Sequence, residues 1–345
     1  MVIVKTPVRI SFLGGGTDYP AHYRAHGGQT LATTIDKYSY ITVSRLHEFF
    51  DHRILVNYSK TEVVNDAEEI QHPSVRECLK FMGISRDIEI HYIGDLPART
   101  GLGSSSSFTV ALLNALHAFK GEMVDQQQLA AEAVHVEQER IRERVGSQDQ
   151  YICALGGLRH LRFHQDLTVD TTPVVMPEGQ LAAFQQRLLF FYTGRRRNAP
   201  EILAEQHRKT QEGTITQELL EMARLVPQGL DVLRQGGDLR AFGELLHDGW
   251  MLKRRFSQAV SSPAVDAWYA RARSAGAIGG KLLGAGSGGF LLFFVEPERQ
   301  ADIREALGEL RELHCRFERQ GSSVTLYEPD RTQAPRRAAS ALVVT

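Results

Sequence analysis

A glycine- and serine-rich stretch, Pro97–Ser107, constrains this chain more than any other part of its sequence. It follows the alternating segment 87–93, which predicts a strand, and precedes residues 108–119, whose apolar positions recur at helical spacing. In this order of strand, loop and helix, Gly101 and Gly103 let the backbone approach a ligand closely, and the first turn of the helix favours an anion. We therefore predict that the loop binds a phosphate group.

An ordinary helix with a serine N-cap would explain part of this stretch, because Ser is a preferred cap residue. One cap needs one serine, whereas four follow Gly103, which favours phosphate binding. The common P-loop pattern is absent, since Gly280-Lys281 has Ala275 in place of the first glycine and Leu282 in place of Ser or Thr. The HRD and DFG triplets of protein kinases are absent too. A nucleotide at this loop therefore requires another fold.

The chain has 345 residues, with 40 basic and 41 acidic side chains and a formal charge of -1. This length predicts two domains. The balanced charge argues against nucleic acid or a membrane surface as a partner, so we expect small molecules. Cys78, Cys153 and Cys315 form neither a disulfide framework nor a paired metal motif. Because no apolar run reaches about 18 residues and the N-terminus lacks a secretion pattern, we expect a soluble, cytoplasmic protein.

Periodicity along the rest of the chain predicts mixed α and β structure. Strands are expected at 2–13, 29–35, 38–43, 187–194, 290–295 and 323–327, and helices at 74–82, at 125–146, over most of 200–275 and at 297–313. We place a domain boundary near residue 180, and we expect the end of the chain to be loosely held.

Polar residues in the first half are candidates for chemistry. Gly14–Gly16 follow the first strand and are bracketed by Arg9 and Asp18, which taken alone are simply a surface cation and a turn residue. Glu137 lies on the apolar stripe of the second helix after the loop, where a buried carboxylate needs either an arginine partner or a metal ion. Asp149 lies in a short polar cluster that by itself indicates only a loop.

Two groups of cations in the second half are candidates for binding a substrate phosphate. Arg195–Arg197 follow a predicted buried strand, where guanidinium groups can hold a phosphate, although such a charge run is more often a solvated face. Lys253 lies three residues after Trp250, a core candidate, and can therefore share its side of a helix. Of the basic residues 253–255, it is the one best placed to point inward. The glycines of 279–289 match GxGxxG, but a strand follows them, so a Rossmann site is a poor interpretation.

Three separated motifs, taken together, resemble the GHMP small-molecule kinase family. They are Pro7–Tyr19, Pro97–Ser107 and Lys281–Phe290, with Gly146–Gln150 between the second and the third. Each motif alone is weak evidence, but the ordered set spans nearly the whole chain. The form Gly-Gly-Gly-Thr-Asp-Tyr resembles the sugar branch of the family, which contains heptose 7-phosphate kinases and the kinase half of fucokinases, and it departs from the Gly-Glu-His of galactokinases.

The resemblance implies an α+β (mixed α/β) fold of two domains. The N-terminal domain, 1–180, would be similar to ribosomal protein S5 domain 2, the C-terminal domain, 181–330, would be ferredoxin-like, and 331–345 would be a flexible tail. It implies an enzyme that uses ATP and Mg²⁺ to phosphorylate the anomeric hydroxyl of D-glycero-D-manno-heptose 7-phosphate, on the route to activated heptose for capsule or lipopolysaccharide. A fucokinase, another sugar 1-kinase, a non-catalytic sugar and ATP sensor, and a homo-oligomer stay open.

The resemblance also implies roles for individual residues. Asp149 matches the family's proposed base, Arg9 the cation beside it, and Ser105 and Glu137 match the Mg²⁺ ligands. The implied nucleotide-binding residues are Pro97, Thr100, Gly101, Leu102, Gly103, Ser104, Ser105, Ser106 and Ser107. We expect the acceptor to be bound by Gly15, Gly16, Thr17, Asp18, Arg197, Lys253 and Gly286, of which Arg197 and Lys253 rest on the charge argument and not on a family motif.

Overall fold

The computed structural model describes residues 1–98, 100–177, 179–194 and 199–329. In this part of the chain the strands are β1 (Val2–Leu13), β2 (Gly28–Arg45), β3 (Ile54–Asn57), β4 (Thr61–Val64), β5 (Ile88–Gly94), β6 (Arg159–Phe163), β7 (Val169–Pro173), β8 (Leu188–Tyr192), β9 (Gly279–Leu282), β10 (Phe290–Phe294), β11 (Arg311–Glu312), β12 (Phe317–Glu318) and β13 (Ser323–Tyr327). The larger sheet has nine strands, six in the order β13-β1-β2-β5-β3-β4, with β12 and β6 paired to β2 and β7 paired to β6. The smaller sheet has the antiparallel order β11-β8-β10-β9.

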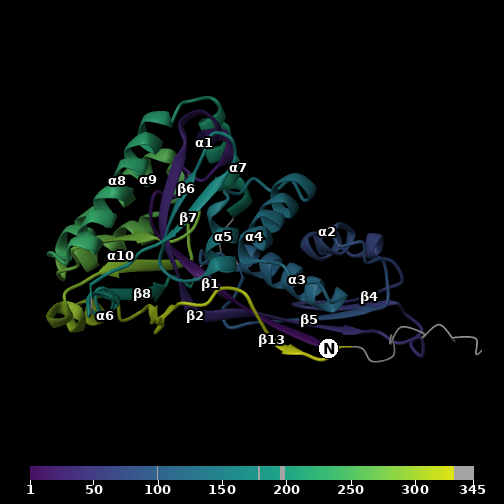
Figure 1. Cartoon of the computed structure of the whole chain (residues 1–345). Helices are drawn as coiled ribbons and strands as arrows, with labels where there is room; N and C mark the ends of the chain where they lie inside the picture. The colour runs from purple at the N-terminus through teal and green to yellow at the C-terminus, as the bar shows by residue number, and fades with distance from the viewer. Residues whose placement is uncertain (99, 178, 195–198, 330–345) are drawn as a thin grey trace, which may run out of the picture.

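Helices cover these sheets in two groups. They are α1 (Pro20–His26), α2 (Pro73–Phe81), α3 (Ser104–Lys120), α4 (Gln126–His135), α5 (Gln148–Leu155), α6 (Gln180–Gln186), α7 (Ala199–Gln211), α8 (Thr216–Gln235), α9 (Arg240–Phe256), α10 (Pro263–Ser274) and α11 (Gln300–Ala306), with a π-helical turn at Val136–Arg140. Figure 1 shows α2, α3 and α4 on one side of β1, β2 and β5, while α8, α9 and α10 gather around β8 at the other end of the molecule. None of the described helices has both the length and the apolar character that a membrane span requires.

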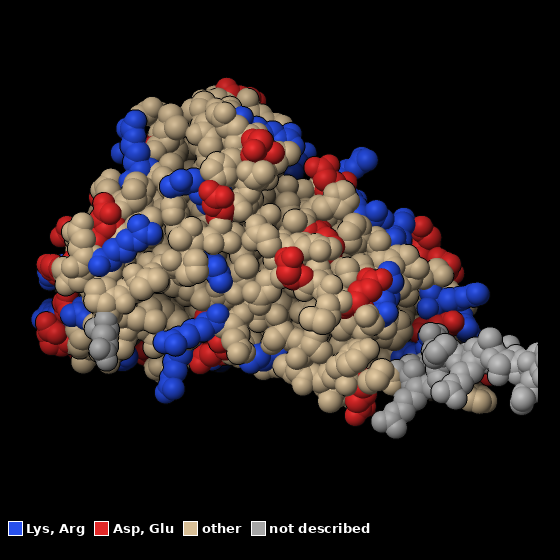
Figure 2. Space-filling view, viewed as in Figure 1, with Lys and Arg blue, Asp and Glu red and all other residues tan. Residues whose placement is uncertain are grey.

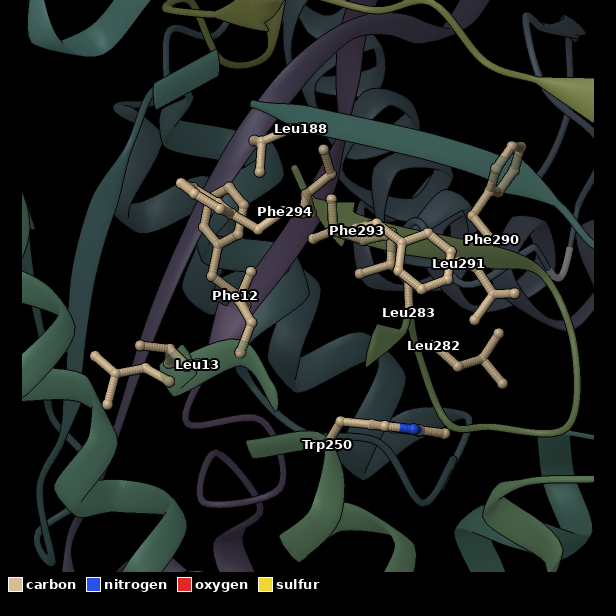
Figure 3. Close-up of a cluster of buried hydrophobic side chains, with 14 of the residues drawn as sticks. Phe12, Leu13, Leu188, Trp250, Leu282, Leu283, Phe290, Leu291, Phe293 and Phe294 are labelled. Atoms are coloured by element: carbon tan, nitrogen blue, oxygen red, sulfur yellow. The ribbon is translucent and has the colours of Figure 1, made fainter. Parts of the chain in front are cut away.

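Each group of helices encloses a hydrophobic core. The first core contains Leu113 of α3 and Ile41 of β2. The second contains Phe184, Phe242 and Trp250, and Figure 3 shows Trp250 with the side chains of β10 in this cluster. The indole of Trp250 is fully buried, which confirms the prediction that this residue belongs to the core.

The strand β1 passes through both cores. Val4 belongs to the first core and Phe12 to the second, and Figure 1 shows this strand, in purple, extending from the N-terminus across the molecule. Its pairing with β2 shifts register at Pro7, which has no N–H to donate to the ladder. The strand therefore carries Arg9, just beyond this shift, to the region between the two cores.

Most predicted elements are confirmed, and the differences have local causes. The strands predicted at 29–35 and 38–43 form the single strand β2, because Asp36 and Lys37 bulge opposite β1 instead of forming a turn. The helix predicted at 108–119 begins earlier, at Ser104, because the serines form its first turn.

The helix predicted at 125–146 is wrong beyond His135. The chain there forms the π-helical turn, reverses at Arg142 with a φ of 62°, and resumes as α5 at Gln148. The helix predicted at 297–313 is limited to α11, because a 3₁₀ turn precedes it and β11 follows it. The first residues of the predicted glycine loop form β9.

The mixed α/β architecture predicted from the sequence is confirmed, whereas the domain limits stay predictions. The chain leaves the larger sheet after β7 and enters the smaller sheet at β8, on either side of residue 180. However, β12 and β13 return to the larger sheet, so the end of the predicted range 181–330 pairs with N-terminal strands. The predicted tail, 331–345, lies outside the described residues.

Candidate active site

Arg9 and Asp149 form a two-pronged ion pair on the wall of a cavity between the cores. The guanidinium donates from Nε to Asp149 Oδ1 and from Nη2 to Oδ2, each at 2.6 Å. Its third nitrogen, Nη1, donates to the carbonyl oxygen of Gly101 at 2.6 Å. Asp149 lies in the first turn of α5, so a helix absent from the sequence prediction brings this carboxylate to β1. A bidentate pair of this kind fixes the orientation of the carboxylate.

The loop predicted to bind phosphate, residues 100–107 (the phosphate loop), packs directly on this pair. The backbone N–H of Arg9 donates to the carbonyl oxygen of Leu102 at 2.8 Å. Gly103 has a φ of 73°, and a Cβ on it would lie 2.9 Å from Arg9 Cγ, so a side chain there would be both strained and crowded. The predicted nucleotide loop and the predicted catalytic residues are therefore brought together through Arg9.

The first turn of α3 presents its backbone N–H groups without a side-chain cap. Gly103 is its N-cap residue and forms no side-chain cap hydrogen bond, so the first N–H groups suit an anion. The third motif packs against the phosphate loop, backbone to backbone. A Cβ on Gly289 would lie 2.1 Å from the carbonyl oxygen of Thr100, so a side chain at this position would collide with the loop. Ser107 has a structural contact instead, since its hydroxyl donates to the carbonyl oxygen of Thr6 at 3.1 Å.

Glu137 lies in the π-helical turn, a feature often found at functional sites. Its Oε2 accepts hydrogen bonds from Ser106 Oγ at 2.9 Å and from Gln150 Nε2 at 2.5 Å, while Oε1 has no hydrogen-bond partner among the described residues. Burial raises the pKa of this carboxyl to about 7. No described arginine forms an ion pair with Glu137, whose neighbour Arg140 pairs with Glu77. Ser105, the serine predicted to bind metal, is exposed.

These groups fit a cation that arrives together with phosphate. Among the described residues, no group of three or more His, Cys, Asp or Glu side chains could hold a metal ion alone. Mg²⁺, however, is usually held by one or two carboxylates together with phosphate oxygens and water. The unpartnered Oε1 of Glu137 and the serine hydroxyls at the start of α3 are oxygen ligands of this type.

Asp18 is held on the cavity wall by backbone donors. Its Oδ1 accepts from the N–H of Gly16 at 2.9 Å and its Oδ2 from the N–H of Gln148 at 3.3 Å. A Cβ on Gly146 would lie 1.9 Å from Oδ2, so only glycine allows the segment before α5 to approach this closely. Burial, and next the charge of Asp149, raises the pKa of Asp18 to about 6.

Two residues predicted to bind the acceptor lie away from the cavity wall. The hydroxyl of Thr17 is buried and donates to the carbonyl oxygen of Gly14 at 2.8 Å, so it braces the glycine turn. Gly286 packs against Val260, whose Cα would lie 2.7 Å from a Cβ on the glycine. Arg197 lies outside the described residues.

Two lysines line the cavity. Lys253 of α9, predicted from its position, donates a hydrogen bond to the carbonyl oxygen of Gly284. Lys281 of β9 was missed as a site residue, although it opens the third motif. Its Nζ donates to the carbonyl oxygen of Phe12 at 2.7 Å, and burial, followed by the charge of Arg9, lowers its pKa to about 7. A single lysine after two glycines at the start of a buried strand was the available signal.

The cavity has a volume of about 140 Å³. This is close to the roughly 150 Å³ that accommodates a six-membered ring in an engineered cavity. Its wall is formed by Arg9, Ser11, Gly15, Gly16, Asp18, Tyr19, Val145, Gly146, Gln148, Asp149, Leu203, Gln206, Met222, Lys253, Phe256, Lys281, Gly284 and Ala285. A glycine loop at a helix N-terminus, beside a small cavity with an ion-paired carboxylate, is the arrangement expected of a small-molecule phosphotransferase.

Comparisons with known proteins give the same class. The family model for the GHMP kinases N-terminal domain matches residues 69–157, and the model for the GHMP kinases C-terminal domain matches residues 230–312. The chain belongs to the GHMP kinases, which are phosphotransferases with an alcohol acceptor and ATP as the phosphate donor.

Sugar kinases are among its relatives. A D-glycero-alpha-D-manno-heptose 7-phosphate kinase of Campylobacter jejuni is 27% identical over 315 residues, covering 88% of this chain and 92% of that protein. A galactokinase of Pyrococcus furiosus is 26% identical over 348 residues, covering 92% of this chain and 94% of that protein. The crystal structure of a D-glycero-D-manno-heptose 1-phosphate kinase from Bacteroides thetaiotaomicron is similar with a TM-score of 0.77, at 22% identity and with 95% and 100% coverage, which shows the shared fold.

Proposed function

We propose that this protein is an ATP-dependent sugar kinase that phosphorylates the anomeric hydroxyl of D-glycero-D-manno-heptose 7-phosphate, giving the 1,7-bisphosphate. The observation that carries this proposal is the Arg9–Asp149 pair, which lies on a cavity of small-molecule size and is bonded to the phosphate loop at Gly101. The similarity to the heptose 7-phosphate kinase over 88% of the chain supports the choice of acceptor.

The residues on the cavity wall would each have a distinct task. Phosphoryl transfer needs positioning and charge neutralisation more than covalent chemistry. The N–H groups at the start of α3 would hold the nucleotide phosphates, and Asp149 would orient the acceptor hydroxyl and accept its proton. Arg9 would keep Asp149 aligned with the acceptor through its two hydrogen bonds to the carboxylate.

A Mg²⁺ ion, when bound, would neutralise oxygens of the transferred phosphate. Glu137 would hold it through Oε1, together with a serine hydroxyl from the start of α3. Ser105 is the serine that the sequence predicts for this task, and it is exposed. Ser106 is the alternative, because its hydroxyl already donates to Oε2 of Glu137.

The acceptor itself would lie between the glycine turn and α9. Asp18 would bind sugar hydroxyls, with Gly15 and Gly16 keeping the wall free of side chains. Lys253 would bind the 7-phosphate, because it is the cation that α9 contributes to this wall. Arg197, outside the described residues, stays a second candidate for that phosphate.

The test is a panel of acceptors offered with Mg²⁺ and ATP and followed by ³¹P NMR. The panel contains heptose 7-phosphate, heptose 1-phosphate, fucose and galactose. We expect heptose 7-phosphate to give a new anomeric phosphate signal and the largest kcat/KM. Faster turnover of another member would reassign the acceptor, and absence of ADP production with every member would favour a sensor of sugar and ATP.

An unphosphorylated sugar is the second candidate acceptor. The galactokinase of Pyrococcus furiosus matches 92% of this chain at nearly the same identity as the heptose phosphate kinase. In that case the Lys253→Ala variant would change KM for the preferred sugar little. For a phosphorylated acceptor, the same variant would raise KM far more than it does for the unphosphorylated sugar.

A further inference from the structure

Lys281 is a buried lysine without an anionic partner among the described residues. Its side chain belongs to β9, is 6% exposed, and lines the cavity with Arg9, Asp18, Asp149 and Lys253. Its one hydrogen bond among the described residues goes to the carbonyl oxygen of Phe12, and no described carboxylate forms an ion pair with it. Burial lowers the pKa of Lys281, and the charge of Arg9, another cation, lowers it further.

Such a placement is unfavourable for the protein alone. A buried ammonium costs several kcal/mol unless an anion or a full set of acceptors compensates it. Asp149 does not supply this compensation, because both of its oxygens accept from Arg9. An ammonium has three donors, and the bond to Phe12 uses one of them. The remaining donors line a cavity, where an anionic ligand can meet them.

The position of β9 indicates which anion this is. Two residues beyond Lys281, the carbonyl oxygen of Leu283 lies 2.5 Å from the Cβ position of Gly101, in the phosphate loop. Arg9, whose charge acts on Lys281, also bonds to Gly101. Lys253 bonds from α9 to Gly284, the residue that follows Leu283 and is also close to Gly101. Lys281 therefore lies next to Arg9, which is bonded to the loop predicted to hold the nucleotide phosphates.

We propose that Lys281 is a catalytic residue that contacts the phosphoryl group of ATP as it is transferred. This inference rests on the proposed kinase reaction but not on the identity of the acceptor. The bond from the γ-phosphorus to ADP breaks, a bond to the acceptor oxygen forms, and the hydroxyl proton goes to Asp149. The negative phosphoryl oxygens favour the protonated form of Lys281, whose ammonium in turn neutralises part of their charge.

The deciding experiment compares two nucleotides by calorimetry in the presence of Mg²⁺. The probes are adenylyl imidodiphosphate, an ATP analogue with a γ-phosphate, and ADP. In the Lys281→Met variant we expect the affinity for the analogue to fall about 10- to 100-fold, as for a lost charge-assisted hydrogen bond. Affinity for ADP should stay within about threefold. An unchanged preference for the analogue over ADP would overturn the proposal.

Two controls separate this role from a structural one. Lys120→Met removes an exposed lysine of α3 and should leave both affinities unchanged. Without ligand, Lys281→Met should melt no lower than wild type, because an apolar side chain replaces an unpaired buried charge. Should this variant fail to fold, Lys281→Gln removes the charge but keeps a donor for the Phe12 carbonyl oxygen, and the same nucleotide comparison applies.

Steady-state kinetics distinguish the two possible sources of the phosphate. We expect kcat of Lys281→Met to fall about 10²- to 10³-fold, with the acceptor KM nearly unchanged. A rise confined to the KM of a phosphorylated acceptor would mean that Lys281 binds the acceptor phosphate and would overturn the assignment. If wild type does not phosphorylate the proposed heptose phosphate, the proposed function fails, whereas the nucleotide comparison still decides the role of Lys281.

Discussion

Asp149 accepts two hydrogen bonds from Arg9 and lies beside the phosphate loop, so its carboxylate can be tested separately from nucleotide binding. In Asp149→Asn we expect kcat to fall about 10²- to 10⁴-fold, the usual contribution of a general base. The affinity for the ATP analogue should barely change, because the hydrogen bonds of Asp149 within the described residues go to Arg9 and Gln148 and not to the loop. Steady-state kinetics and calorimetry measure the two quantities. Asp170→Asn, at an exposed position of β7, is the matched control, and near wild-type turnover in Asp149→Asn would remove this residue from the mechanism.

Glu137 should make stability depend on pH. Its pKa is raised by burial from 4.5 to about 7, so between these pH values the folded chain binds more protons than the unfolded chain. The stabilisation is present in full below the unfolded pKa and is lost as pH rises through the folded pKa. For a shift of this size, the free energy of unfolding should fall by about 3 kcal/mol across that window.

The measurement is chemical unfolding between pH 4 and pH 8 without Mg²⁺ or nucleotide. Glu137→Gln cannot titrate at this position and should lose the Glu137 part of the slope, whereas Asp18, whose pKa is raised to about 6, contributes equally to the slope of both proteins. Glu139→Gln changes an exposed neighbour in the same turn and should keep the wild-type slope. Equal slopes in wild type and Glu137→Gln would show that another group titrates.

At the scale of elements, the N-cap of α3 is the most sensitive point. Gly103→Ala places a Cβ at a φ of 73° and 2.9 Å from Arg9 Cγ. Gly179, the N-cap of α6, has a φ of 76° but open space around it, so Gly179→Ala is a matched control for backbone strain. Both variants should lose about 1–2 kcal/mol of stability. Only Gly103→Ala should also lower nucleotide affinity and kcat. If Gly103→Ala and Gly179→Ala lowered kcat equally, the phosphate loop would have no specific role in catalysis.

The elements also show how far the sequence could predict the site. The sequence predicts the phosphate loop because a strand, a run of glycines and serines, and a helix follow one another directly along the chain. The sequence does not predict the α5 helix, because its first turn, with Gln148 and Asp149, is polar and has the composition of a loop. The π-helical turn was not predicted either, although the position of Glu137 on an apolar stripe did predict that its carboxylate needs an arginine partner or a metal ion.

At the scale of the whole molecule, pairings between remote segments were beyond sequence reasoning. Lys281 bonds to the carbonyl oxygen of Phe12, 269 residues away along the chain, and no local pattern predicts such a contact. The return of β12 and β13 to the larger sheet is equally remote, because β13 pairs with β1 at the opposite end of the sequence. These contacts join strands from both ends of the chain in the larger sheet, whose strands β1 and β2 contribute to both cores.

This sharing predicts that the two cores unfold together. Phe184 of α6 packs against Phe12 of β1 with ring centroids 5.4 Å apart and against Phe317 of β12 at 5.9 Å. Phe184→Ala should therefore lower the free energy of unfolding by about 3–5 kcal/mol. It should shift a single transition, seen both by the fluorescence of Trp250 and Trp268 and by hydrogen exchange of α3 amides. Phe49→Ala, at a residue that is 91% exposed, should leave that transition unchanged. Two separate transitions, with only the fluorescence one shifted by Phe184→Ala, would show that the cores fold independently despite the strands they share.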